Sequence, residues 1–139
     1  MRMPLLVAAI ALAAPAFAAA PIGGRWITVE RDSIVTVAPC GGALGGKLCG
    51  RITTFLKRPP TANPVDTKNP DPALRGRPIL GMAVLSGFAD AGKDWRGRIY
   101  DPRSGRSYKS IVSRNVDGTL KVQGCVAFLC RTQVWTPTR

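Results

Sequence analysis

Histidine is missing from this chain of 139 residues. Its absence excludes catalytic sites in which histidine activates a nucleophile, metal sites with imidazole ligands, and the commonest general base near neutral pH. An enzyme would therefore need paired carboxylates, as in glycoside hydrolysis, or a serine and a lysine. Asp66, Asp71 and Asp101 are the best carboxylate candidates. Salt-bridged loop scaffolding explains these carboxylates more simply, so we expect no enzymatic activity.

Acidic residues are scarce, because 8 Asp and Glu face 20 Lys and Arg, which gives a net charge of +12. A surface of this sign attracts anions. Nucleic acid would be the expected partner inside a cell. If the protein is exported, as residues 1–20 indicate below, the expected partner is instead an anionic component of the cell envelope, such as a lipid head group. The plain alternative is that the charge only keeps the surface soluble.

Long hydrophobic runs are lacking as well. The uncharged run from Leu5 to Ala14 follows a basic residue and is too short to span about 30 Å of hydrocarbon. Behind it, Ala16-Phe17-Ala18 and Ala18-Ala19-Ala20 both show the small-x-small pattern that signal peptidases accept. Residues 1–20 are therefore predicted to be a signal peptide, cleaved after Ala18 or Ala20, that delivers the protein to the periplasm or the medium. No transmembrane segment is expected in the mature chain.

Amphipathic-helix spacing is absent from residues 21–139, which are long enough for one domain. Short β-rich runs recur instead between Gly, Pro and Asp residues. The predicted strands are Arg25–Glu30, Ile34–Ala38, Leu48–Phe55, Ile79–Phe88, Trp95–Tyr100, Ser107–Ser113, Thr119–Cys125 and Cys130–Trp135. Because an open sheet would expose two edges, we expect an all-β, antiparallel, up-and-down barrel of eight strands, with a two-sheet sandwich as the alternative.

One segment interrupts the strands. Residues 57–78 (KRPPTANPVDTKNPDPALRGRP) contain six prolines and no apolar periodicity. Proline lacks the N–H that a central strand needs, and Asn-Pro and Asp-Pro pairs favour turns, so this loop is expected to fold on itself. Its Arg75 and Arg77 are candidate contacts for an anionic group.

Four cysteines, all in the predicted mature chain, indicate two disulfides in an exported protein. Three pairings are open. Cys40 with Cys49 and Cys125 with Cys130 is the favoured pairing, because each pair brackets a hairpin whose facing Cα atoms lie about 4.5–5.5 Å apart. A tetrathiolate zinc site is the rival, and the eight residues between Cys40 and Cys49 disfavour it.

Gly24 and Trp26 open the first predicted strand. In lipocalin-like barrels a tryptophan at this place plugs one end, and an arginine of the last strand lies across it. Arg131 resembles that arginine, and its stacking on Trp26 would be structural.

Five segments together resemble the bacterial domain-of-unknown-function 2147 family. They are Gly24-x-Trp26, residues 39–51 (PCGGALGGKLCGR), residues 68–81 (KNPDPALRGRPILG), residues 99–108 (IYDPRSGRSY) and residues 124–135 (GCVAFLCRTQVW). The resemblance covers essentially the whole mature chain. It implies an exported, lipocalin-like antiparallel barrel with room for a ligand, and no established activity.

Strand alternation predicts the residues that face the barrel interior. The candidate ligand contacts chosen on this rule are Trp95, Ile99, Tyr108, Val112, Leu120 and Val122. Gly and Ser on the same faces leave space, although a barrel of this size can also pack solid. The leading hypothesis is a barrel that binds a small apolar or anionic amphipathic molecule without cofactor or metal. The alternative is an envelope interaction or inhibitor protein whose basic surface binds an acidic partner.

Overall fold

The structure, a computed structural model, describes residue 4, residues 7–12 and residues 18–139. The described part is built of strands with two short 3-10 turns, η1 (Gly42–Leu44) and η2 (Pro72–Leu74). The strands are β1 (Gly24–Ile27), β2 (Ser33–Pro39), β3 (Leu48–Phe55), β4 (Ala83–Asp90), β5 (Trp95–Asp101), β6 (Arg106–Arg114), β7 (Leu120–Val126) and β8 (Leu129–Thr138).

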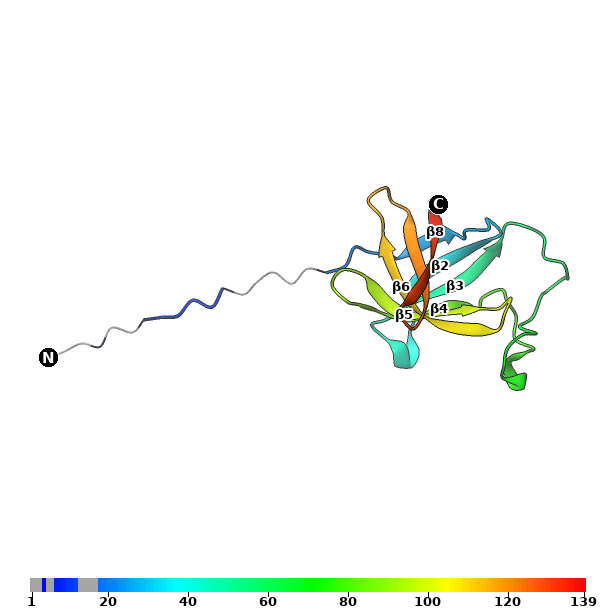
Figure 1. Cartoon of the computed structure of the whole chain (residues 1–139), viewed down its shortest axis with the longest axis horizontal. Helices are drawn as coiled ribbons and strands as arrows, with labels where there is room; N and C mark the ends of the chain where they lie inside the picture. The colour runs from blue at the N-terminus through cyan, green and yellow to red at the C-terminus, as the bar shows by residue number, and fades with distance from the viewer. Residues whose placement is uncertain (1–3, 5–6, 13–17) are drawn as a thin grey trace.

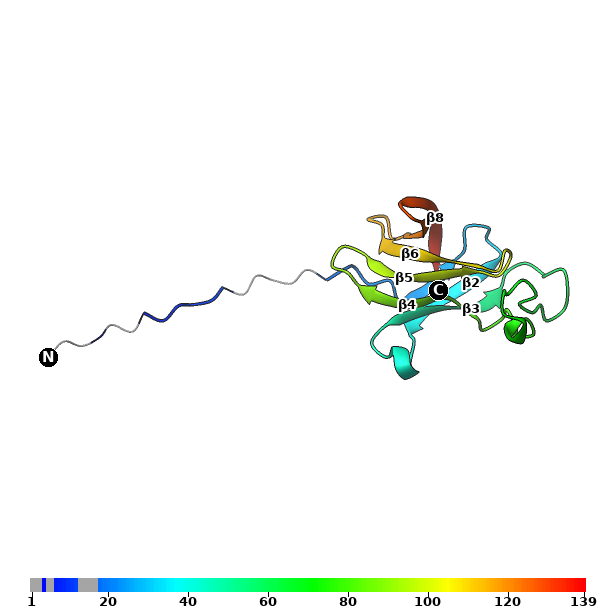
Figure 2. The same cartoon turned by 60° about the horizontal axis from the view of Figure 1, so that its bottom comes forward.

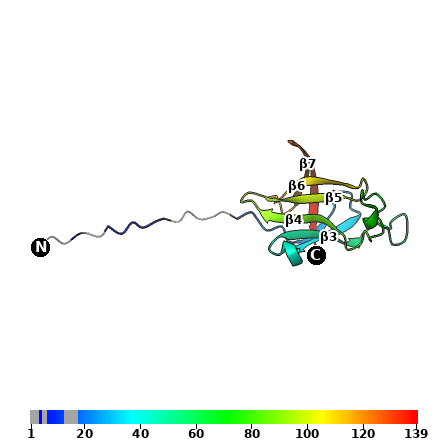
Figure 3. The same ribbon diagram turned by 90° about the horizontal axis from the view of Figure 1, so that it is seen from below.

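Each strand pairs antiparallel with its neighbour in the chain, and β8 returns to pair with β1 (Figure 1). The expected eight-stranded, up-and-down barrel is therefore confirmed, and the two-sheet sandwich is excluded. Figure 3 shows β3, β4, β5 and β6 side by side in chain order. Because the sheet closes, every described strand has a hydrogen-bonded neighbour on both sides.

The connections alternate between two ends of the barrel. The β1–β2, β3–β4, β5–β6 and β7–β8 connections lie at one end, here called the mouth. The other connections and the segment that enters β1 lie at the opposite end, here called the base. In Figures 1 and 2 the N-terminal segment leaves from the base, and η2 of the β3–β4 connection lies on the far side of the molecule.

Three predicted strand boundaries are wrong by three residues or more. β8 continues past Trp135 to Thr138, where it pairs with β1, and backbone turns explain the other two. β1 ends at Ile27 rather than Glu30, because Arg31 has a φ of 57° and its N–H donates to the Thr28 carbonyl at 2.9 Å, which forms a tight turn. β4 begins at Ala83 rather than Ile79. There the chain turns first, since Met82 N–H donates to the Ile79 carbonyl at 3.1 Å.

Large apolar side chains fill the base. Trp26, Phe88, Val112 and Leu120 are each at most 2% exposed and belong to one core cluster. Burial of such a side chain stabilises the fold by about 1.5–3 kcal/mol relative to leaving it in water. The base of this barrel is therefore packed solid.

Both disulfides have the favoured pairing. Cys40 is bonded to Cys49 across the β2–β3 connection, with Cα atoms 4.8 Å apart. Cys125 is bonded to Cys130 across the β7–β8 hairpin, with Cα atoms 4.0 Å apart. The zinc alternative is thereby excluded, because all four thiols are consumed.

The proline-rich loop folds on itself, as expected from its turn-forming dipeptides. Val65 and Pro78 form an isolated antiparallel bridge, and Asp66 N–H donates to the Arg77 carbonyl at 3.0 Å. Asp71 caps η2 by accepting from Ala73 N–H at 3.0 Å. The loop is thus an ordered element beside the mouth (Figure 2).

The loop also packs closely on the β5–β6 turn. Gly105, with a φ of 72°, lies against the main chain of Lys68, and a Cβ at this glycine would overlap the Lys68 carbonyl oxygen. No flexible side-chain end can move aside there, because the obstructing atom is backbone. Gly118 has a similar φ of 87° in the β6–β7 turn and open space around it.

The comparison of Gly105→Ala with Gly118→Ala tests this contact. Both changes place an alanine at a positive φ, which costs about 1–2 kcal/mol. Gly105→Ala should cost a further 1–3 kcal/mol, roughly the penalty of overpacking, because it displaces the loop from the turn. Urea unfolding should show the difference, and limited proteolysis should cut residues 56–82 faster only in Gly105→Ala. Equal behaviour of the two variants would contradict the contact.

Candidate functional site

A cavity of about 990 Å³ opens at the mouth and reaches into the middle of the barrel. Its size lies at the upper end of ordinary small-molecule sites. The walls come from β2, β3, β4, β5, β6, β7 and β8, and one side of the opening is formed by prolines of the β3–β4 loop, including Pro59, Pro60 and Pro64.

The inner wall of the cavity is mainly apolar. It is lined by Val35, Ile52, Val84, Ile99 and Trp135. Because these side chains come from five different strands, they surround the space rather than form one flat face. A surface of this kind favours a hydrocarbon chain over water.

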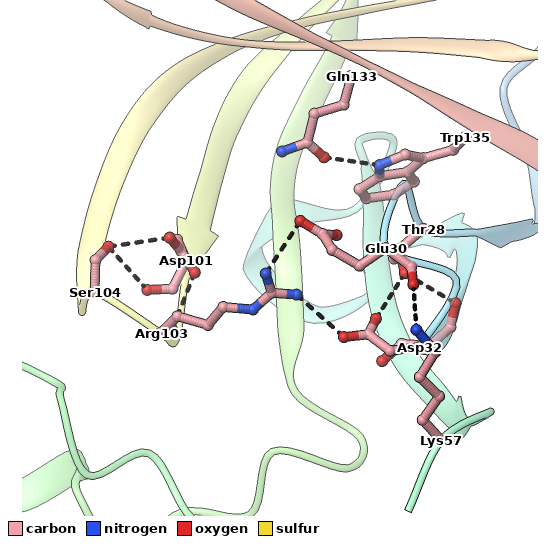
Figure 4. A network of polar contacts seen from close by, with 10 residues as sticks. Thr28, Glu30, Asp32, Lys57, Asp101, Arg103, Ser104, Gln133 and Trp135 are labelled. Atoms are coloured by element: carbon pink, nitrogen blue, oxygen red, sulfur yellow. Dashed lines mark hydrogen bonds and ion pairs between the residues drawn. The ribbon is translucent and has the colours of Figure 1, made fainter. Parts of the chain in front are cut away.

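Two polar side chains interrupt this wall. Tyr108 and Gln133 line the cavity, and the Gln133 amide oxygen accepts from the Trp135 indole N–H at 3.0 Å (Figure 4). The Gln133 amide nitrogen and the Tyr108 hydroxyl can therefore donate to a ligand oxygen.

Gly124 of β7 explains why space remains inside. A Cβ at this position would lie 3.6 Å from Ile99 Cγ2 and 3.8 Å from Tyr108 Cβ, which is ordinary van der Waals contact. A larger residue would fit at its Cβ and extend into the cavity. The glycine thus leaves unfilled a volume that a Leu would occupy.

An ion-pair bridge crosses the mouth. Arg103 of the β5–β6 turn donates to Glu30 Oε1 at 3.0 Å and to Asp32 Oδ2 at 3.1 Å, both in the β1–β2 connection (Figure 4). In an eight-stranded barrel these two connections lie on opposite sides of the opening. The Arg103 side chain is 61% exposed, so each pair contributes at most about 1 kcal/mol. The bridge therefore narrows the opening and costs little to break.

Cations outnumber carboxylates around the cavity. Lys57, Arg58, Arg103, Arg106 and Arg131 line it, against Glu30, Asp32 and Asp101. In the described part of the chain no carboxylate lies within ion-pair distance of Arg58, Arg106 or Arg131. The mouth therefore offers uncompensated positive charge to an anion.

The predicted ligand contacts divide into two groups. Ile99 and Tyr108 do line the cavity. Val112, Leu120 and Val122 face inward as alternation requires, but they belong to the buried core and are not among the residues that line the cavity. They are not cavity positions, because alternation gives the face of a strand and not the depth along the barrel axis.

Trp95 is a base residue as well. It begins β5, packs beside the core and donates its indole N–H to the Ala20 carbonyl at 2.9 Å. It therefore lies at the end opposite the mouth, not at the cavity.

Arg75 and Arg77 hold the loop together instead of lining the cavity. Arg75 Nε donates to the Asn69 carbonyl at 2.8 Å, and Arg77 Nε donates to Asp66 Oδ2 at 3.0 Å. The Arg77 guanidinium also lies over the Tyr100 ring, 5.4 Å from its centroid. The arginines that do line the mouth are Arg106 on β6, Arg131 on β8, Arg103 in the β5–β6 turn and Arg58 at the start of the same loop.

Asp66 is the buried anchor of the loop, with no exposed surface. Its carboxylate accepts from Tyr100 Oη at 2.6 Å, Asn69 Nδ2 at 2.9 Å and Arg77 Nε. Burial alone would raise the pKa of Asp66, but these hydrogen bonds and the Arg77 charge together hold it below its ordinary value. Burial and the bond to Asp66 raise the pKa of Tyr100 to about 12.

The other two candidate carboxylates also have structural partners. Asp71 caps η2, and Asp101 accepts from Arg103 N–H at 3.0 Å and from Ser104 Oγ at 3.1 Å within the β5–β6 turn. With Asp66 in the loop anchor, each carboxylate is accounted for by a turn or loop that it stabilises.

Trp26 has a stacked arginine, but not the predicted one. The guanidinium over its ring belongs to Arg114 at the end of β6, 5.6 Å from the ring centroid. Trp26 pairs with Pro137 of β8, and Arg131 lies six residues before Pro137, about 20 Å along the strand. The assignment of Arg131 to Trp26 is therefore wrong, and Arg131 lines the cavity instead.

Gly24 begins β1 with a φ of 130°, which L side chains rarely adopt.

Sequence reasoning missed Arg103, Arg106 and Gln133. Arg106 has the same strand parity as Tyr108, and Gln133 has the same parity as Trp135, so alternation could have identified both. Arg103 lies in a turn, where no periodicity applies, and its bridge to Glu30 joins residues 73 apart in the chain.

Comparisons with known proteins give one family and one fold. A family model described as "Uncharacterized protein conserved in bacteria (DUF2147)" matches residues 24–137. The chain is similar to a solved structure described as "Protein HP1028 from the human pathogen Helicobacter pylori belongs to the lipocalin family". The TM-score is 0.72 at 23% identity, over 86% of this chain and 84% of that chain, which shows the lipocalin-like fold. No curated protein matches the chain.

The loop anchor generates a pH prediction. Because the folded-state pKa of Asp66 lies below its unfolded value of about 3.9, the ionised carboxylate stabilises the fold above that value. This contribution is lost as the pH falls through the folded-state pKa. Asp66→Asn should therefore lower the free energy of unfolding at pH 7 by about 1.5–3 kcal/mol and flatten its decline below about pH 5.

Asp71→Asn is the matched control, because asparagine also caps a helical turn and should leave the stability at pH 7 close to wild type. Chemical denaturation at several pH values measures both. An Asp66→Asn protein as stable at pH 7 as the control would contradict the anchor.

Proposed function

The chain belongs to the DUF2147 family of uncharacterized bacterial proteins, and from this premise we propose that it is an exported barrel that binds a small amphipathic molecule. The apolar chain of the ligand lies in the cavity, and its anionic head group lies at the mouth. The observation that carries this proposal is the change in lining, from apolar side chains inside to unpaired arginines at the opening.

The apolar part of the cavity supplies the affinity. Each methylene group that leaves water for such a wall contributes about 0.8 kcal/mol, which lowers Kd roughly fourfold. Gly124 supports a role in binding rather than packing, because a larger side chain there would meet no close contact at its Cβ.

The mouth supplies the preference for charge. Arg106 and Arg131 have no carboxylate partner among the described residues, so an incoming anion displaces water and no existing ion pair. Both guanidinium groups can hold a carboxylate or phosphate through two parallel hydrogen bonds. The Arg103 bridge can open as the ligand enters, since it is exposed and weak.

Export rests on two features of the chain. Residues 1–20 have the pattern of a signal peptide. The two disulfides are typical of an oxidising compartment, which makes the periplasm or the medium the proposed location. Separately, no helix in the described residues has the length and apolar character needed to cross a membrane.

A chain-length series tests the cavity. Delipidated protein should bind octanoate, decanoate and dodecanoate with Kd falling about fourfold per methylene until the cavity is full. Gly124→Leu should weaken dodecanoate binding at least tenfold while the thermal midpoint stays unchanged or rises, because the new side chain fills the space. Isothermal titration calorimetry measures these values. Absence of binding, or binding of equal strength to Gly124→Leu, would sink the proposal.

Arginine substitutions test the mouth. Arg131→Gln and Arg106→Gln should each weaken dodecanoate binding about fivefold and leave binding of dodecanol unchanged, because only the acid is charged. Arg98→Gln is the control, since Arg98 lies on β5 at the outer surface and is exposed. An equal loss in Arg98→Gln would assign the effect to net charge rather than to the mouth.

The basic exterior favours a second candidate, an envelope protein that binds an acidic partner. The net charge of +12 supports it. Such binding weakens steeply with ionic strength, whereas burial of an alkyl chain does not. Calorimetric titrations at about 0.05 and 0.5 M salt therefore separate the two functions.

A further inference from the structure

The segment that enters β1 is built into the base of the barrel. Ala19 is 8% exposed and Ile22 is 1% exposed, whereas Ala18 and the described residues 7–12 are exposed. Ala19 is thus the first buried residue of the described chain. Ala20 and Pro21 are exposed, and Ile22 is buried again.

Side chains of the barrel hold three consecutive carbonyl groups of this segment. The Trp95 indole N–H donates to the Ala20 carbonyl at 2.9 Å. Arg114 Nη1 donates to the Pro21 carbonyl at 3.3 Å. The Trp26 indole N–H donates to the Ile22 carbonyl at 2.9 Å. Loss of Ala20 would leave the Trp95 indole without this acceptor. Cleavage after Ala20 would therefore remove part of the base.

The backbone nitrogen of Ala19 lies within hydrogen-bond distance of the Asp90 carboxylate. It is 3.1 Å from Asp90 Oδ1 and 3.2 Å from Asp90 Oδ2, at the end of β4. An amide nitrogen has one hydrogen to share between two oxygens, whereas an ammonium has three and a positive charge. The position fits a chain terminus better than a peptide group, because charge-assisted hydrogen bonds are roughly twice as strong as neutral ones.

We propose that the chain is processed between Ala18 and Ala19, and that the new α-ammonium group of Ala19 pairs with Asp90 and locks the base. A peptidase adds one water to this peptide bond. The Ala18 carbonyl carbon takes the oxygen and leaves as a carboxylate, and the Ala19 nitrogen takes the protons and becomes an ammonium. The sequence Ala16-Phe17-Ala18 fits the small-x-small requirement of signal peptidases.

The inference rests on the proposed export and bears on the proposed binding. With the segment locked, the base is closed and the cavity has its opening at the mouth. The ion pair exists only after cleavage, so it belongs to the exported protein and not to its precursor.

Mass spectrometry of the protein purified from the periplasm of a bacterial host that expresses the whole chain tests the cleavage site. The intact mass, with both disulfides formed, should correspond to a chain that begins at Ala19. A chain that begins at Pro21 or upstream of Ala19 would overturn the inference and leave export standing. An uncleaved chain would overturn both.

A double-mutant cycle tests the ammonium. Asp90→Asn is compared in the form that begins at Ala19 and in a form in which Gly-Ser precedes Ala19. The carboxylate also accepts from Gly92 N–H at 2.8 Å in the β4–β5 turn, and that role is common to both forms. Asp90→Asn should lower the thermal midpoint by about 3–5 °C more in the Ala19 form. Equal shifts in the two forms would overturn the ion pair.

Discussion

The pairing of β1 with β8 is the constraint on which the rest of this protein depends. β1 has only four residues, yet it is hydrogen-bonded to β2 on one side and to β8 on the other. Closure turns one face of every strand toward a common interior, so that residues far apart in the chain share one space. It also places alternate connections at the two ends, and the ends then differ because their side chains differ.

At the base, large apolar side chains and the entering segment exclude water. At the mouth, Gly124 and the polar Gln133 stand where larger apolar side chains would fill the space. Arg58, Arg106 and Arg131 line this end and have no carboxylate partner among the described residues. One half of the barrel thus stabilises the fold and leaves the other half free to bind. The buried Asp66 has a similar role for the long loop, because it fixes one rim of the opening through contacts with Tyr100 and Arg77.

The sequence was sufficient where a local rule decides the structure. Alternation identified Ile99 and Tyr108, since β5 and β6 pair one to one without a bulge, and hairpin geometry identified both disulfides. It failed where position depends on distant parts of the chain. Depth along the barrel separates Val112 from Tyr108, although both face inward. The contacts of Arg77 depend on Asp66 and Tyr100, and the partner of Trp26 depends on where β6 ends.

Native mass spectrometry of the mature protein, purified without detergent from the periplasm of its own host, tests whether the barrel holds a ligand. We expect a mass above that of the disulfide-bonded chain, with the excess lost on denaturation as an anionic amphiphile that the Gly124→Leu variant does not retain. The same mass for native and denatured wild-type protein, together with a side-chain-filled barrel in an experimental structure, would contradict it.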